Sequence, residues 1–177
     1  KKIGNNILLA SDSNLSQVRV LDPQRGEQVA FLQLEDEVLE ICQTLPEGVA
    51  YYDSISNSVC YLDGELKQIQ TVSLGTDMQT PVISPDGSEI YYCVEDEIRA
   101  YDVNNKISRL IKNHTYSQLE LLGTCFDGSQ IVGRFADGDG ISTVYISVSN
   151  GQTMYVENEI EELTTWKDQY YAVRMDG

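Results

Sequence analysis

The stretch that decides the fold is Ser84-Pro85-Asp86-Gly87-Ser88-Glu89-Ile90-Tyr91-Tyr92, in which a turn motif leads directly into an apolar run. Proline pre-sets φ for a turn, aspartate accepts backbone hydrogen bonds, and glycine supplies a positive φ. The isoleucine and tyrosines that follow are typical of a strand. This stretch therefore predicts a turn followed by a β-strand over residues 89–94.

Parts of this pattern recur along the chain. A glycine closes an equivalent turn at three positions that are 39 and 41 residues apart, namely Gly48, Gly87 and Gly128. An aspartate ends a later strand at similar intervals, at Asp22, Asp63 and Asp102. Self-similarity with a period of about 20–50 residues is the signature of a repeat protein. We therefore expect a structural unit of about 40 residues.

Each repeat contains four short runs of β-branched, aromatic and aliphatic residues. In the clearest repeat the runs cover residues 79–84, 89–94, 97–103 and 107–112, and they are bounded by Gly, Pro, Asn or Asp. Four strands in about 40 residues match one blade of a β-propeller. The predicted blades are 1–37, 38–78, 79–118, 119–160 and the incomplete 161–177.

The fold expected from these repeats is all-β: a single partial propeller domain of about four four-stranded antiparallel blades. The first repeat is expected to begin at the turn around Gly4 and to hold three strands, which gives seventeen strands in total. We also expect the chain to be part of a larger propeller. Further blades, or another chain, would then protect its exposed sheet faces and edges.

The stretch 84–92, together with Glu97-Ile98-Arg99-Ala100-Tyr101-Asp102-Val103, resembles the S-P-D-G repeat of TolB-like (WD40-like) propellers. Leu45-Pro46-Glu47-Gly48 and Cys125-Phe126-Asp127-Gly128 keep part of the motif. The resemblance implies a blade architecture whose motif residues are structural. Members of the family include protein-binding periplasmic components, surface lipoproteins and the gating domains of prolyl peptidases.

The charge of the chain excludes some classes of partner. Lys and Arg number 12 against 28 Asp and Glu, which gives a formal net charge of −16. Such a charge repels phosphate backbones and anionic lipid headgroups, so we expect no nucleic-acid partner. No apolar run approaches the roughly 20 residues that span a bilayer, so direct membrane insertion is not expected either.

Cysteines and aromatic residues are expected to be structural. The four cysteines, Cys42, Cys60, Cys93 and Cys125, lie in apolar runs without metal-ligand spacing. Their interpretation as buried small hydrophobes is favoured over disulfides or ligands. Most of the tyrosine doublets and Trp166 are expected to pack in the core, with stacking on a ligand as the alternative.

Asp137-Gly138-Asp139-Gly140 is the most metal-like stretch, because Asp137 and Asp139 could chelate a hard cation such as calcium. The EF-hand pattern fails, since Ile141 stands where another oxygen ligand is needed. An Asp-Gly pair between two strands is also a standard signal for a tight hairpin. The hairpin is therefore the favoured interpretation, and the metal site is the alternative.

The remaining candidate residues lie at predicted connections between blades. His114, the only histidine, is expected to be a solvent-facing loop residue. The acidic clusters Glu35-Asp36-Glu37 and residues 157–162 are interpreted as a solvated face, with attraction of a basic partner as the alternative.

No nucleophile elbow, P-loop, dinucleotide fingerprint or zinc-protease motif occurs in the sequence. The predicted function is therefore non-catalytic, without a cofactor: binding of a protein or peptide through the loop face of the propeller. The alternatives are a substrate-gating propeller of a larger, prolyl-peptidase-like hydrolase, and a ligand- or metal-sensing propeller. The resemblance implies an extracytoplasmic location, periplasmic or at the cell surface, and the cysteines favour a cytoplasmic one.

Overall fold

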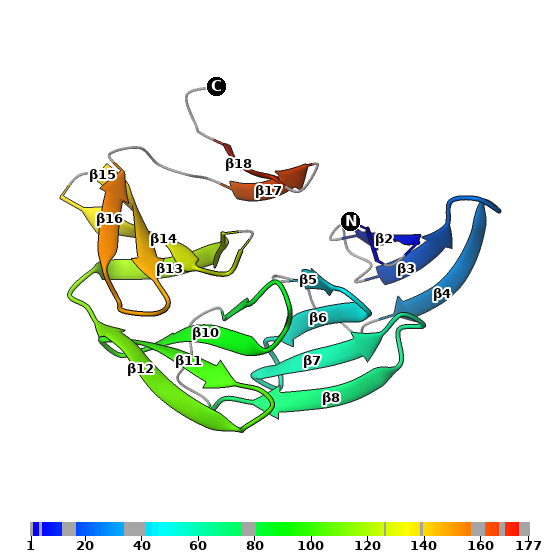
Figure 1. Ribbon diagram of the computed structural model, residues 1–177, viewed down its shortest axis with the longest axis horizontal. Helices are drawn as coiled ribbons and strands as arrows, with labels where there is room; N and C mark the ends of the chain where they lie inside the picture. The colour runs from blue at the N-terminus through cyan, green and yellow to red at the C-terminus, as the bar shows by residue number, and fades with distance from the viewer. Residues whose placement is uncertain are drawn as a thin grey trace. The chain divides into compact units, whose positions relative to one another are not determined.

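Figure 1 shows the computed structural model, whose described residues form β-strands, turns and connections but no helix. The predicted all-β fold is confirmed. Within the described residues there is accordingly no helix with the length and apolar character needed to span a membrane. The chain divides into two compact units, residues 1–76 and 77–177. The structure describes residues 2–3, 5–11, 17–33, 42–75, 81–125, 127–138, 140–156, 162–166 and 169–173.

The first unit contains two four-stranded antiparallel sheets whose strands are neighbours in sequence order. One sheet consists of β1 (Lys2–Ile3), β2 (Asn6–Ser11), β3 (Gln17–Asp22) and β4 (Glu27–Gln33). The other consists of β5 (Cys42–Leu45), β6 (Gly48–Asp53), β7 (Ser58–Asp63) and β8 (Gln68–Ser73). A four-stranded meander made from one short stretch of chain is the architecture of a propeller blade.

The first sheet has one strand more than the sequence predicted. β1 pairs with β2 through Lys2↔Ile7 and Ile3↔Asn6. The expectation of three strands in this repeat, and of seventeen in total, was therefore wrong, since the described residues form eighteen. The reason is that β1 is only two residues long, which is too short to show an alternating pattern.

The second unit contains two more four-stranded meanders and a hairpin. The first meander is β9 (Val82–Ile83), β10 (Glu89–Val94), β11 (Glu97–Asp102) and β12 (Ile107–Asn113). The second is β13 (Ser117–Thr124), β14 (Gln130–Asp137), β15 (Gly140–Ser147) and β16 (Thr153–Val156). The hairpin is β17 (Glu162–Trp166) and β18 (Gln169–Val173).

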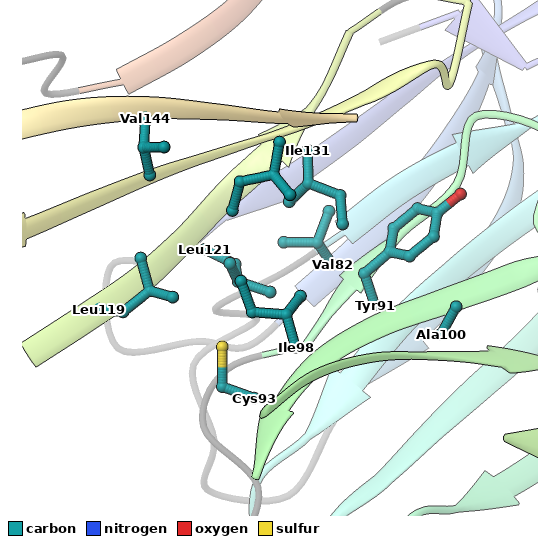
Figure 2. Close-up of a cluster of buried hydrophobic side chains, with 10 residues drawn as sticks. Val82, Tyr91, Cys93, Ile98, Ala100, Leu119, Leu121, Ile131 and Val144 are labelled. Atoms are coloured by element: carbon teal, nitrogen blue, oxygen red, sulfur yellow. The ribbon is translucent and has the colours of Figure 1, made fainter. Parts of the chain in front are cut away.

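The core of the second unit lies between its two four-stranded sheets (Figure 2). One sheet contributes Val82, Tyr91, Cys93, Ile98 and Ala100. The other contributes Leu119, Leu121, Ile131, Val144 and Ile146. Alternate residues of a strand point to opposite faces, so Ile98 and Ala100 reach the same side of β11. Each fully buried Ile or Val stabilises this packing by about 1.5–3 kcal/mol.

The first unit is built in the same way. Its core joins β3 to β6 and β7 through Val18, Val20, Val49, Tyr51, Cys60 and Leu62. Ala30 and Leu32 of β4 pack against this cluster from the outer edge of their sheet. In both units, therefore, one meander covers the apolar face of the next.

The turn before β10 shows what the motif residues do. The Gly87 N–H donates to the Ser84 carbonyl oxygen at 2.9 Å, which closes the turn. The Asp86 carboxylate accepts the Ser88 N–H at 3.0 Å and the Ser84 hydroxyl at 2.7 Å. Aspartate at this position therefore holds both ends of the turn together.

The corresponding turn before β14 forms the same backbone bonds without Ser-Pro. The Gly128 N–H donates to the Cys125 carbonyl oxygen at 2.8 Å, and the Asp127 carboxylate accepts the Ser129 N–H at 3.0 Å. Aspartate and glycine thus suffice for the turn geometry.

The aspartates that end the third strand of a repeat each cap the following turn. Each carboxylate accepts the backbone N–H two residues later: Asp22 from Gln24 at 2.8 Å, Asp63 from Glu65 at 2.9 Å and Asp102 from Asn104 at 3.0 Å. Such local bonds favour turns over continued strands. The spacing found in the sequence therefore reflects turn chemistry.

Two of the described cysteines and two tyrosine doublets are buried as the sequence predicted, whereas Cys125 is not fully buried. Cys60 and Cys93 are buried free thiols, and burial raises the pKa of Cys93 to about 12. Cys125 is a free thiol that is partly exposed. Both tyrosine doublets at 51–52 and 91–92 are buried. The side chains of Cys42 and Trp166 and the doublet at 170–171 lie outside the described side chains.

We predict that Gly151→Ala destabilises the second unit more than Gly138→Ala does. Both glycines have a positive φ, at 67° and 60°, which costs an alanine about 1–2 kcal/mol. At Gly151 the new Cβ would also lie 2.7 Å from the Ile111 carbonyl oxygen, whereas at Gly138 it would meet nothing within 4 Å. The clash adds about 1–3 kcal/mol. Urea unfolding of both variants tests this, and equal losses would contradict it.

We also predict a pH-dependent contribution from Asp86. Hydrogen bonds from the Ser88 N–H and the Ser84 hydroxyl lower the pKa of Asp86 below its ordinary value of 3.8. A lowered folded-state pKa means that the carboxylate stabilises the fold above about pH 4, and that this contribution is lost as the pH falls through the folded-state pKa.

Asp86→Asn should therefore lower the free energy of unfolding by about 1 kcal/mol at pH 7. The difference from the unaltered chain should shrink as the pH falls below about 4. Urea titrations of both proteins at a series of pH values measure the difference. A difference that stays constant down to the lowest pH would be inconsistent with this role.

Candidate functional site

Each unit has a surface pocket within the range that small ligands occupy, about 300–1,000 Å³. The pocket of the first unit measures about 450 Å³ and is lined by turns, with Asp22, Gln24 and Glu47 among its residues. Its Asp22 carboxylate already accepts the Gln24 N–H and lies 3.7 Å from the Arg25 side chain. The described residues that line this pocket include no aromatic ring, so the second pocket is the stronger candidate.

The pocket of the second unit measures about 470 Å³ and has three aromatic rings in its wall. Tyr116 comes from the β12–β13 connection, Phe135 from β14 and Tyr155 from β16. The ring centroids of Tyr116 and Phe135 are 4.7 Å apart. Tyr155 meets both rings edge-on, with centroid distances of 6.2 Å in each case. We call these three residues the aromatic triad.

Strand register brings the aromatic triad together. Tyr155 pairs with Val144, and Val144 pairs with Gly133, so the three positions share one face of the sheet. Phe135 lies two residues beyond Gly133 and therefore points to the same face. This is the face that carries the core, and Tyr116 and Phe135 pack directly against that core. The aromatic triad is thus the partly exposed end of the apolar layer between two sheets.

Gly133 makes room for this layer. A Cβ at this position would lie 3.1 Å from both the Glu120 carbonyl oxygen and the Leu119 Cδ1 atom. Glycine therefore lets β13 lie close beside β14 in the sheet, with the Leu119 side chain against the backbone of β14. Any larger residue would shift Leu119, which belongs to the core beneath the aromatic triad.

His114 is buried, so the expectation of a solvent-facing histidine was wrong. Its side chain is 8% exposed and stacks on Tyr116 with a centroid distance of 5.4 Å. Its Nδ1 accepts the Tyr116 N–H at 3.2 Å, while in the described part of the chain Nε2 has no hydrogen-bond partner. Burial lowers the pKa of His114, which favours the neutral form of its ring. The buried His114 ring therefore packs against the face of the Tyr116 ring and helps to hold it in place.

Asp137 lines the pocket next to the aromatic triad. It is the last residue of β14 and pairs with Gly140, the first residue of β15, so the favoured hairpin interpretation agrees with the structure. Asp139 lies outside the described residues. Among described residues, no group of three or more His, Cys, Asp or Glu is placed to hold a metal ion. The metal site at Asp137 and Asp139 therefore stays a hypothesis.

Nearly all residues of the acidic clusters predicted at blade connections fall outside the part of the chain that the structure describes. Glu35-Asp36-Glu37 and residues 157–161 lie outside the described residues. Glu162 is the first residue of β17, and its side chain is not among those described.

The two tyrosine hydroxyls of the aromatic triad form a hydrogen bond of 3.0 Å. Burial, together with this bond, raises the pKa of Tyr116 to about 12. The same bond lowers the pKa of the exposed Tyr155, because an ionised Tyr155 oxygen accepts the Tyr116 hydroxyl proton. A side-chain hydrogen bond with Thr153 and the Lys112 charge act in the same direction. Tyr155 is therefore the member of the pair that ionises first.

The aromatic triad was not predicted from the sequence. Its members are single aromatic residues on separate strands or connections, unlike the conspicuous tyrosine doublets. One sequence signal does exist: Phe135 follows Ile131 and Gly133 on the same strand face. Such a signal becomes useful only when the pairing of β14, β15 and β16 is known.

We predict that Tyr116→Phe raises the pKa of Tyr155 toward 10. The substitution removes the hydroxyl that stabilises the Tyr155 phenolate, and it keeps the ring that packs on Phe135. Titration of Cζ-labelled tyrosine by NMR measures the change. Lys112→Gln serves as a comparison and should raise the same pKa by a smaller amount, since the Lys112 charge lowers this pKa less than the Tyr116 hydrogen bond does. An unchanged Tyr155 pKa in Tyr116→Phe would exclude this donor role.

Comparison with known proteins supports the fold only. No family model and no curated protein match the sequence. Similar solved structures include Kuenenia stuttgartiensis hydrazine synthase, with 15% identity over 90% of this chain and a TM-score of 0.59. Dihydro-heme d1 dehydrogenase NirN, solved in complex with DHE, has 14% identity over 98% and a TM-score of 0.62. TolB from Acinetobacter baumannii has 15% identity over 89% and a TM-score of 0.56.

The chain spans less than half of each of these structures, at 49%, 40% and 42% of their lengths. At such low identity the activities that their names describe belong to those proteins alone. What they share with this chain is the propeller-type, all-β architecture of four-stranded antiparallel sheets.

Proposed function

We propose that this chain is a non-catalytic binding domain that takes a protein or peptide partner in the pocket formed by the aromatic triad. The observation that carries the proposal is an open pocket of about 470 Å³ with three aromatic rings in contact with one another. Aromatic rings give large contact areas at a small cost in side-chain entropy. Peptides commonly dock in aromatic-lined grooves.

The rigidity of the pocket supports the same proposal. Tyr116 is fixed by stacking on His114, by packing on Phe135 and by its hydroxyl bond to Tyr155. A ligand that binds a preformed wall loses less free energy to ordering the protein. Tyr155 is nevertheless 57% exposed, so part of its ring is available to a partner.

The proposal also covers the class of partner, the family, the location of the protein and the presence of further blades. The partner is a protein or peptide and not nucleic acid, which the formal net charge of −16 disfavours. The proposed family is that of TolB-like propellers, and the proposed location is extracytoplasmic; both rest on the Ser84–Gly87 turn motif and on the similarity to TolB. Further blades, on this chain or another, would pack beside those described here, and the two-stranded sheet β17–β18 is consistent with this arrangement.

We predict that short random peptides displayed on phage and selected on the 177-residue chain bind through Tyr155. Tyr155→Ala should raise the dissociation constant of the selected peptides at least about tenfold, as expected for the loss of an aromatic hot spot. Isothermal titration calorimetry with synthetic peptides measures this effect.

Met154→Ala is the matched control. Met154 is 55% exposed, close to the value for Tyr155, and it points to the opposite face of β16. Its substitution should change the dissociation constant less than about twofold. The proposal fails if no peptide is selected, or if both substitutions weaken binding equally.

A further inference from the structure

The rim of the aromatic pocket carries a carboxylate without a charged partner in the described part of the chain. Asp137 lines the pocket beside Phe135, and its described contact is a long hydrogen bond of 3.4 Å from the Ser142 hydroxyl. It belongs to none of the ion pairs among the described residues. The carboxylate therefore remains accessible to a cation from outside.

The arginines of this unit do not supply that cation. Each arginine in the described part of the second unit is paired with a glutamate: Arg99 with Glu97, Arg109 with Glu89 at 2.7 Å, and Arg134 with Glu120 at 2.7 Å. Each of these pairs lies within a single four-stranded sheet. Asp137 is one of several carboxylates of this unit that lie outside these ion pairs, and among the described lining residues it is the one that borders the aromatic pocket.

We infer that the pocket accepts a lysine or arginine side chain of the partner peptide, with its charged end on the Asp137 carboxylate and its aliphatic stem along Phe135 and Tyr155. The inference rests on the proposed function, because it names the group that enters the proposed binding pocket. A side chain with an apolar stem and a charged end matches a wall of rings with one carboxylate at its edge.

The rings themselves favour a cation. The face of a tyrosine or phenylalanine ring carries negative electrostatic potential and attracts a cation that lies within about 6 Å of the ring centroid. The same preference is visible in the first unit, where the Arg19 guanidinium lies 5.4 Å from the centroid of Phe31. With a formal net charge of −16, the whole chain also attracts basic peptides over longer distances.

Lys112 provides an internal comparison. Its charge acts on both Tyr155 and His114, but its side chain does not belong to the lining of the pocket. For a cationic ligand, Lys112 is a weak repulsive charge and Asp137 is the attractive one. For an anionic ligand the two roles would be reversed. The responses to neutralising each residue therefore have opposite signs for the two classes of ligand.

The test uses the peptides selected on the full chain and copies in which arginine is replaced by citrulline and lysine by norleucine. Each peptide is titrated calorimetrically into the unaltered chain, Asp137→Asn and Lys112→Gln, after circular dichroism has shown that the variants are folded. We expect basic residues in the selected peptides. We also expect the neutral copies to bind about tenfold more weakly to the unaltered chain.

Binding of each peptide and its neutral copy to the variants distinguishes direct contact with Asp137 from long-range attraction by the net charge of the chain. On Asp137→Asn the dissociation constants of a basic peptide and its neutral copy should differ by about twofold or less. On Lys112→Gln the full difference should persist, and the basic peptide should bind slightly more tightly than it binds the unaltered chain. Glu120→Gln is the control for net charge, since Glu120 is already paired with Arg134 outside the pocket lining. It should leave the difference unchanged.

Two results would overturn the inference while leaving the proposed function intact. In the first, peptides bind in a Tyr155-dependent manner, but their neutral copies bind equally well. In the second, binding depends on acidic peptide residues and weakens in Lys112→Gln. Failure to select any peptide would instead reject the proposed function itself.

Discussion

In each unit of this chain, the apolar face of one four-stranded sheet is removed from water by the sheet that neighbours it in sequence. A single meander of about 40 residues cannot bury such a face alone, so the repeats are stable only when they stack. The second unit shows the result, with Ile98 of one sheet and Val144 of the next both fully buried in a shared core. Turn chemistry, strand order and the candidate site all depend on this packing.

The candidate site is a direct consequence of the same layer. Beyond the aliphatic core residues of β14 and β15, the aromatic residues Phe135 and Tyr155 continue the core face to the surface. The inner part of the layer provides stability, and its outer end provides a rigid wall with one exposed ring. Because Phe135 and Asp137 are neighbours on the same strand end, the apolar wall and the accessible carboxylate occur together. A binding pocket therefore arises without any departure from the blade architecture.

The sequence predicted those features that depend on local chemistry. Aspartate and glycine located the turns because their side-chain and backbone bonds are made within a few residues, as at Asp86 and Gly128. The sequence did not predict features that depend on contacts between residues of different strands. His114 is buried because Tyr116 stacks on it, and the aromatic triad exists because strand register aligns Tyr155 with Gly133 through Val144. β1 was missed because two residues carry too little pattern.

The central claim, that consecutive meanders share one core, is tested most directly by methyl NOE spectroscopy on the second unit. The account predicts cross-peaks between the methyl groups of Ile98, on the sheet β9–β12, and those of Leu119, Leu121 and Val144, on the sheet β13–β16. If spectra of the folded chain showed no cross-peak between these two sets of methyl groups, the two sheets would not share a core, and the account would be contradicted.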